Sequence, residues 1–306
     1  LLTSQESYLF LDGHYRLYGD TLGTDDISVE LIEEDRVARL AEVIDGDQLK
    51  RLHLERDRLS YSSFRDIVEK TTLKDRRYGE DWVAEARATK DDEEIKSMES
   101  AIDRTLDLFD MISTWIEPGL TEQELSRGVR RELESRSEGQ SFDPLILFAE
   151  RTANPHAPSE KRVLEEGDAL LIDMGLTING YCSDLTRMFF CGERESPSNE
   201  LYDLSKRASA KALPMIEDGV AASKVAGQAH NVIRNAGHDE HLRHGLGHGV
   251  GLKVHEAPRL SESSDETLEA GMVVTLEPGI YIDGVGGGRI EHMALVTEDG
   301  ARILDS

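Results

Sequence analysis

Five short stretches of the sequence each supply one side chain that binds metal ions well. They are Asp173 in LLIDMG, Asp184 in YCSDLTR, His248 in HGLGHGVG, Glu277 in TLEPG and Glu291 in GGRIEH. Four carboxylates and one imidazole suit hard or borderline divalent cations such as Mn²⁺ and Co²⁺, whereas a structural zinc site favours thiolates. Bridging carboxylates can hold two cations about 3.5–4 Å apart, and such a pair polarises a hydrolytic water. The set therefore predicts a dinuclear metallohydrolase.

The positions of the carboxylates support this interpretation. Asp173 and Asp184 are eleven residues apart on two predicted strands joined by a turn, so adjacent strands can bring both to one site. For either aspartate alone, a turn or a helix cap is the alternative. Glu291 lies in the apolar run 290–296, where an unpaired acid is costly. We therefore expect Glu291 to bind metal, with an ion pair to Arg289 as the alternative.

Histidines cluster around the proposed ligand His248. His244 lies four residues before it and His255 seven after it, and glycines on both sides of His248 allow the backbone to pack closely there. His156, seventeen residues before Asp173, would by itself be an ordinary loop histidine. Five others are interpreted as core or surface residues without a chemical role: His14, His53, His230, His238 and His241.

The first 88 residues are predicted to form a small N-terminal α/β domain without a chemical motif. The runs YLFL and HYRLYG flank Asp12-Gly13, which predicts a β-hairpin. The charged segment 28–44 carries apolar residues at near-helical spacing, and LSYSSFRDIVEKT predicts a turn and a short helix. We expect this domain to serve as a scaffold or in dimerisation.

Residues 89–306 are predicted to form the catalytic domain. A long helix is expected to end at the Pro-Gly pair 118–119, and Thr121 with Glu124 predicts a capping box that opens a second helix. Further helices are expected near Pro197 and Ser223, and strands at ALLIDMG, YCSDLTRMFF, GLKVHE, MVVTLEPGIYI and RIEHMALVTE. Because helices and strands do not alternate regularly, the predicted fold class is α+β rather than a doubly wound sheet.

The composition is strongly acidic. Asp and Glu total 61 against 35 Lys and Arg, a formal net charge of −26, and only 10 of the cationic residues are lysines. Such a surface repels phosphate backbones, so nucleic-acid binding is not expected. An ordinary acidic cytosolic enzyme is one explanation. Because lysine is scarce, we favour a high-salt cytoplasm, where a Debye length of about 3 Å at 1 M salt screens self-repulsion.

The sequence carries no sign of membrane insertion or secretion. No run approaches the roughly 20 apolar residues of a membrane span, and no signal-peptide pattern is found. Cys182 and Cys191 form neither a disulfide framework nor a metal motif, and we expect free thiols on a buried strand. A cytoplasmic protein without membrane contact is therefore predicted.

The motifs taken together resemble those of a known family. His156, IDMG with GYCSDLTR, GLGHGVGLKVHE, LEPGIY and GRIE are similar to the metallopeptidases with the pita-bread fold. These are methionine aminopeptidase, aminopeptidase P, prolidase and the metal-free creatinase branch. The likeness covers about residues 90–306. The extra N-terminal domain and the short spacing from Glu277 to Glu291 resemble the prolidase and aminopeptidase P branch, although the N-terminal region is shorter than usual there.

The resemblance implies a metal-binding role for each matched ligand. Asp184 and Glu291 would bridge two cations. Asp173 would bind one of them, and His248 with Glu277 would bind the other. Glu277 would also shuttle protons to and from the bridging water. The resemblance thus implies two divalent ions per chain, Mn²⁺ or Co²⁺.

The resemblance also implies how the substrate is held. His156, His244 and His255 would contact the substrate and stabilise the tetrahedral oxyanion, with Arg289 nearby. One departure is His292, where the branch usually has an acidic residue; it would act on the metal site without being a ligand.

The activity expected from the resemblance is hydrolysis of Xaa-Pro bonds by a homodimer, in dipeptides or at the N-termini of peptides. A methionine aminopeptidase is the nearest enzymatic alternative, and the N-terminal domain and the short spacing between the glutamates weigh against it. A non-catalytic relative that binds peptides or proteins, and a metal-free creatinase-type hydrolase, should both have lost ligands, but all five are retained.

Overall fold

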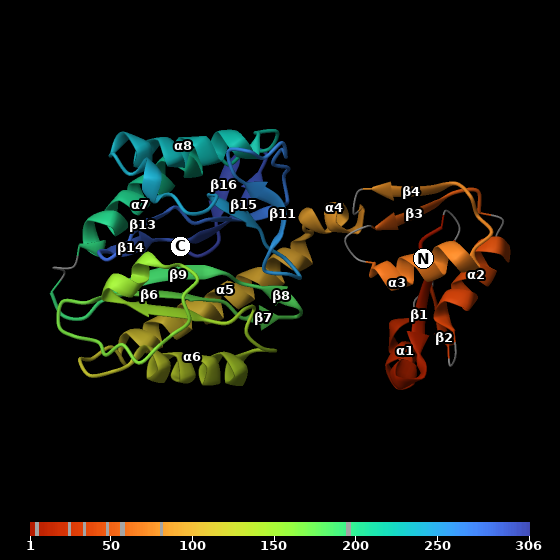
Figure 1. The fold of residues 1–306 in the computed structure, drawn as a ribbon, viewed down its shortest axis with the longest axis horizontal. Helices are drawn as coiled ribbons and strands as arrows, with labels where there is room; N and C mark the ends of the chain where they lie inside the picture. Colours follow the sequence, from red (N-terminus) through yellow and green to blue (C-terminus); the bar gives the residue numbers. More distant parts are fainter. Residues whose placement is uncertain are drawn as a thin grey trace. The chain divides into compact units, whose positions relative to one another are not determined.

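The chain forms two compact units. The computed structural model describes residues 1–3, 6–23, 26–32, 35–46, 49–55, 59–79, 82–193 and 197–306. The first unit is Leu1–Trp82 and the second is Val83–Ser306 (Figure 1). Each has its own buried apolar core, and every predicted site residue lies in the second.

The first unit contains parallel strand pairs and helices. β1 (Ser7–Asp12) pairs with β2 (Ile27–Ile32), and β3 (Leu52–Glu55) pairs with β4 (Arg76–Gly79). The helices are α1 (Arg16–Leu22), α2 (Arg36–Gly46) and α3 (Tyr61–Lys70). The core residues are Ile44, Leu52, Leu54 and Ile67. This core is small, and no predicted site residue contributes to it.

One prediction for the first unit is wrong, one holds in part and one is confirmed. The hairpin at Asp12-Gly13 does not form, because Asp12 caps a 3₁₀ turn by accepting a hydrogen bond from the His14 backbone N–H at 3.0 Å. The segment 28–44 is a strand in its first part and a helix in its second, and its residues 33–34 lie outside the described ranges. The short helix predicted from LSYSSFRDIVEKT is confirmed as α3, with Ser60 as its N-cap.

The second unit contains the longest of the described helices, together with one short helix. They are α4 (Trp82–Ala88, which begins at the end of the first unit), α5 (Asp92–Ser113), α6 (Glu122–Arg136), α7 (Ser198–Ala212) and α8 (Ala222–Asn235). The predicted capping box is confirmed, because Thr121 Oγ1 accepts from the Glu124 N–H and the Glu124 carboxylate accepts from the Thr121 N–H. Ser223 does not cap α8, since Ala221 occupies the N-cap position.

The strands of the second unit form antiparallel sheets. The order β5-β6-β9 joins β5 (Leu145–Phe148), β6 (Ala169–Met174) and β9 (Leu185–Phe190). The order β11-β10-β12-β15-β16 joins β10 (Gly247–Gly249), β11 (Glu256–Leu260), β12 (Val273–Leu276), β15 (His292–Thr297) and β16 (Gly300–Ile303). Two hairpins pair β7 (Thr177–Ile178) with β8 (Tyr181–Cys182), and β13 (Gly279–Ile282) with β14 (Gly286–Arg289).

These sheets lie between two pairs of helices. In Figure 1, α5 and α6 lie on the side of β6 and β9, whereas α7 and α8 lie on the side of β13–β16. One core packs α5 and α6 against β6, and a second packs α7 and α8 against β12 and β15. Because the described strand pairs of this unit are antiparallel, the α+β prediction is confirmed.

Three further predictions can be compared with the fold. GLKVHE is not a strand: residues 251–255 are bends, and β11 begins only at Glu256. Cys182 and Cys191 are buried free thiols, as predicted. Within the described residues, no helix has both the length and the apolar character needed to cross a bilayer.

Candidate metal centre

Thr186 of β9 connects the carboxylates of the two sheets. It lies opposite Asp173 of β6 in the ladder, and Asp184 lies just before β9. The backbone N–H of Glu291, between β14 and β15, donates to the Thr186 carbonyl at 3.3 Å. The Thr186 hydroxyl donates to Glu291 Oε2 at 2.7 Å. The ladder register thus brings Asp173 close enough for its charge to act on Asp184, as the prediction of neighbouring strands requires, and Glu291 joins them from the segment between β14 and β15.

Glycines determine the position of His248 on β10. A Cβ at Gly247 would lie 2.2 Å from the Thr275 carbonyl oxygen, and one at Gly249 would lie 2.0 Å from the Ala257 carbonyl oxygen. Only glycine allows β10 to approach its neighbours β12 and β11 this closely. The His248 N–H is in turn held by Thr275 Oγ1 at 3.0 Å. The glycine-rich sequence is thus explained by packing around the imidazole.

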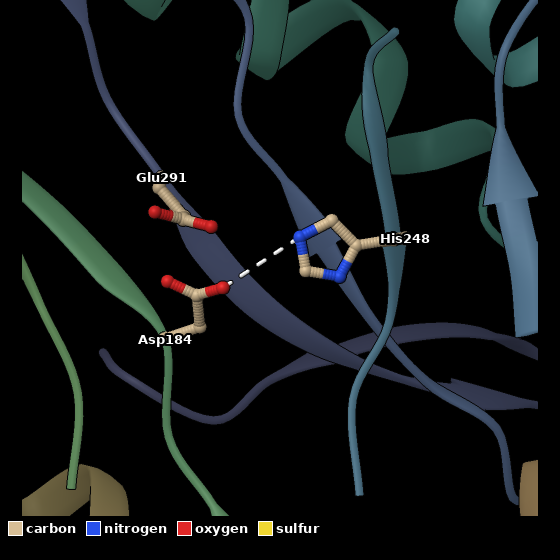
Figure 2. Close-up of side chains that lie close together, drawn as sticks. All are labelled: Asp184, His248 and Glu291. Carbon is tan, nitrogen blue, oxygen red and sulfur yellow. Dashed lines mark ion pairs between the residues drawn. The ribbon is translucent and has the colours of Figure 1, made fainter. Parts of the chain in front are cut away.

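The imidazole of His248 faces a group of carboxylates. Its Nε2 lies 3.4 Å from Glu277 Oε1 and 3.6 Å from Asp184 Oδ2. One potential ligand atom from each of Asp184, His248 and Glu291 lies within 4.8 Å of the other two (Figure 2). The other ring nitrogen, Nδ1, lies 3.1 Å from the Gly249 carbonyl oxygen. A proton on Nδ1 is therefore satisfied by the backbone, and Nε2 is directed at the carboxylates.

Burial and mutual repulsion perturb the acids strongly. Burial, followed by the charges of neighbouring carboxylates, raises the pKa of both Asp184 and Glu291 well above the usual values. Burial also raises the pKa of Asp173 to about 6, although the Arg289 charge opposes it. For Glu277, burial is outweighed by the His248 hydrogen bond and by the His244 and Arg289 charges, and its pKa is about 2. Such crowding favours cation binding.

Arg289 holds Asp173 and Tyr281. This guanidinium is only 4% exposed and donates to Asp173 Oδ2 at 2.5 Å, to the Tyr281 hydroxyl at 2.9 Å and to Thr186 Oγ1 at 2.9 Å. The ion pair considered for Glu291 is thus made to Asp173. Sequence reasoning missed Tyr281, although it lies in the LEPGIY motif. Asp173 Oδ1 is buried and without a hydrogen-bond partner among the described residues, which fits a cation ligand.

The three predicted substrate histidines occupy different surroundings. His255 is exposed, and its ring meets the His248 ring edge-on with centroids 4.3 Å apart. His244 Nε2 lies 2.8 Å from the Tyr281 hydroxyl, and its Nδ1 lies 4.0 Å from Glu277 Oε2. Burial lowers the pKa of His244 and of His255, and in both the charge of His156 lowers it further. His156 itself is exposed, with its N–H donating to Asn154 Oδ1.

A second residue that was not predicted from the sequence, the carboxylate Asp305, lies behind the site. Asp305 Oδ2 is 2.9 Å from Nδ1 of His292 and accepts from the Arg187 guanidinium at 2.6 Å. Arg187 also donates to the backbone carbonyl of Glu291 at 2.7 Å. The unusual His292 is therefore paired with an acid from another part of the chain. No local motif marks Asp305, so the sequence offered no signal for it.

The family comparison agrees with the motifs. A family model described as "Metallopeptidase family M24" matches residues 96–298, which include every candidate residue of the site. The curated Xaa-Pro dipeptidase of Pyrococcus furiosus is 34% identical over 247 residues, which cover 80% of this chain and 71% of that relative.

Solved structures of similar proteins give the same result for the fold. An Xaa-Pro dipeptidase from Bacillus anthracis is similar with a TM-score of 0.94 at 30% identity, covering 100% of this chain and 86% of that one. An X-Pro aminopeptidase from Thermotoga maritima is similar with a TM-score of 0.90 at 31% identity, covering 100% of this chain and 87% of that one.

Proposed function

This chain belongs to the metallopeptidase family M24, and from that premise we propose that it hydrolyses Xaa-Pro peptide bonds as a metal-dependent exopeptidase. The main support for the proposal is the convergence of ligand atoms from the buried Asp184 and Glu291 and the partly buried His248. The resemblance to pita-bread metallopeptidases stated from the motifs is confirmed by the family match and by the solved neighbours. Peptides with proline at the second position are the proposed substrates.

The donor set suits two divalent ions. Asp184 and Glu291 would bridge them, Asp173 would bind one, and His248 with Glu277 would bind the other. The support is the orphaned Asp173 Oδ1 and the crowding of four carboxylates that cannot all be ionised cheaply. When bound, such cations supply polarisation of the scissile carbonyl and a lowered pKa for the attacking water.

Glu277 is the proposed proton carrier. The His248 hydrogen bond and the charges of His244 and Arg289 hold the pKa of Glu277 at about 2 in spite of burial, so Glu277 is in the ionised form that a proton acceptor requires. It would accept a proton from the attacking water on a carboxylate oxygen. It would then pass that proton to the prolyl nitrogen as the peptide bond breaks.

The histidines would bind and orient the peptide. His255 lies against the His248 ring, so a substrate carbonyl held near His248 comes within its reach. His244, with its Nε2 directed at Tyr281, and His156 would complete the contacts and stabilise the oxyanion. Arg289 would act nearby, through the position of Tyr281.

Elemental analysis tests the metal part of this proposal. Protein purified with excess Mn²⁺ should hold two ions per chain. Asp184→Ala should lose both, Asp173→Ala chiefly one, and the exposed control Asp143→Ala neither. Fewer than one bound ion in the unmodified protein would overturn the catalytic proposal.

A substrate panel tests the specificity. Xaa-Pro dipeptides, longer Xaa-Pro peptides and Met-peptides should be compared with the metal-loaded protein. Cleavage of the first two classes, but not of Met-peptides, is expected. Preference for Met-peptides would instead identify a methionine aminopeptidase, and binding without turnover would identify a non-catalytic peptide-binding relative.

The same proposal includes finer properties. We expect Mn²⁺ or Co²⁺ as the ion, a homodimer, and a high-salt cytoplasm as the working environment. The ligand chemistry supports the first, and the net charge of −26 supports the last. Activity measured with each ion tests the metal, and light scattering in molar KCl tests the homodimer. The salt dependence of activity tests the working environment.

A further inference from the structure

Glu122 is a fully buried carboxylate that is remote in sequence from every candidate ligand. It is 0% exposed, in the first turn of α6. A buried acid without partners is costly, whereas one that is fully hydrogen-bonded can fix the groups that surround it. The hydrogen-bond partners of the Glu122 carboxylate belong to one segment, residues 148–160, which carries His156.

Both ends of that segment are attached to this one carboxylate. On one side, Glu122 Oε1 accepts from the Phe148 N–H at 2.8 Å. On the other, Oε2 accepts from the Glu160 N–H at 2.7 Å. The Arg151 Nε–H is shared by both oxygens, at 3.0 Å from each. The Glu122 carboxylate therefore links both sides of the loop 154–158, which has His156 at its centre, and the Gln123 N–H adds a hydrogen bond to the Glu160 carbonyl at 3.1 Å.

Arg151 extends this anchor into the loop itself. Its second guanidinium nitrogen donates to the Pro158 carbonyl at 2.7 Å, and its backbone carbonyl accepts from the Asn154 N–H at 3.0 Å. The neighbouring Thr152 accepts from the Gly287 N–H at 2.7 Å, which fixes the segment against β14. β14 ends at Arg289, so the anchored segment is held against the strand that leads into the metal centre.

We propose that Glu122, acting through Arg151, is a positioning residue that holds the His156 loop in place for substrate binding. It touches neither substrate nor metal. The inference rests on the proposed function only for the role of His156. The anchoring of the loop can be measured without any substrate.

The kinetic test is a double-mutant cycle on the Mn²⁺-loaded protein. Glu122→Gln keeps the shape but loses the charge that Arg151 needs, and should lower kcat/KM for an Xaa-Pro dipeptide by about 10- to 100-fold, because a displacement near 1 Å can cost that much. Metal content should not change. In the His156→Ala background, Glu122→Gln should cause no further loss. An equal loss in both backgrounds would overturn the proposal, because Glu122 would then act independently of His156.

Two more variants keep the test decisive. Glu160→Gln is the matched control, since it removes an exposed partner of Arg151 but leaves the Glu160 N–H on Glu122, and it should leave kcat/KM within about twofold of the unmodified protein. Arg151→Lys changes the other side of the same ion pair at a less buried position, so it replaces Glu122→Gln in the kinetic test if Glu122→Gln does not fold. It retains the charge without the forked geometry, and a wild-type kcat/KM in Arg151→Lys would contradict the proposal.

Amide hydrogen exchange separates this inference from the proposed function. Exchange over residues 149–160 should accelerate in Glu122→Gln, while exchange in α8 should not. Unchanged exchange in 149–160 would refute the anchoring even if Xaa-Pro hydrolysis is found. If the unmodified, metal-loaded protein cleaves no Xaa-Pro substrate, the proposed function fails, and the exchange experiment still decides whether Glu122 anchors the loop.

Discussion

Replacing Gly249 by alanine should displace the proposed ligand His248. The added Cβ would lie 2.0 Å from the carbonyl oxygen of Ala257 and 2.5 Å from its carbonyl carbon. Both are backbone atoms of β11, so no flexible side chain can move aside. Because ordinary contact begins near 3.4 Å, the two strands must separate by about 1.4 Å. Gly249 does not have a left-handed backbone, so the effect comes from this close approach to β11 and not from backbone strain.

A displacement of this size is large for a metal ligand. Overpacking of this kind typically costs about 1–3 kcal/mol of stability, and a misplacement near 1 Å about 10²-fold in rate. Gly249→Ala should therefore lower kcat/KM by about 100-fold. It should also lower the amount of bound Mn²⁺, which elemental analysis measures.

The control for this variant is Gly227→Ala in α8. Its Cβ would lie no closer than 3.6 Å to Glu262 Oε1, and alanine should raise the free energy of unfolding by about 0.5–1 kcal/mol. Normal metal content and a near-normal kcat/KM in Gly249→Ala would show that close strand packing does not position His248.

Three other measurements test the remaining reasoning. His255→Ala should lower kcat by about 10²–10⁴-fold with metal content near normal; an empty site in this variant would make His255 a ligand. The melting temperature and the activity should both rise from dilute buffer to molar KCl, because salt screens the net charge of −26. Divalent metal should raise the melting temperature further. Equal stability and activity in dilute buffer and in molar KCl would exclude the high-salt interpretation. Burial opposes the charge of Asp305, but His292 and Arg187 outweigh it and hold the pKa of Asp305 below 3.8. Because the pKa of Asp305 is lower in the folded than in the unfolded protein, the ionised carboxylate stabilises the fold at pH values above the unfolded pKa. Asp305→Asn should therefore lower the free energy of unfolding by about 3–5 kcal/mol near neutral pH. In chemical denaturation, the difference between the variant and the unmodified protein should shrink below about pH 3.8.

Local patterns predicted those elements whose ends are determined by neighbouring residues. The Thr121–Glu124 capping box starts α6 as expected, because both of its hydrogen bonds lie within one turn. GLKVHE was expected to be a strand and is not. There, Glu256 accepts from the Lys253 N–H at 3.0 Å and pairs with Lys90 and Arg87, so residues far along the chain determine the bend. The hairpin predicted at Asp12-Gly13 is absent for a different, local reason, because the Asp12 side chain accepts from the His14 N–H and caps a 3₁₀ turn.

The chemical nature of the site follows from the residue types and their order along the chain. Oxygen-rich cation ligands are indicated by the types and order of five residues: Asp173, Asp184, His248, Glu277 and Glu291. The glycines beside His248 predict a close backbone contact. Both are properties of side chains and of short segments, so they can be recognised without coordinates.

Which groups come into contact depends on the packing of the folded chain. Arg289 binds Asp173, 116 residues away, rather than the nearby Glu291. Asp305 supplies the carboxylate beside His292, and Glu122 joins the two ends of the His156 segment. These contacts depend on how two sheets and their helices pack, and the free energy of a buried charge depends on partners that packing brings from distant parts of the chain.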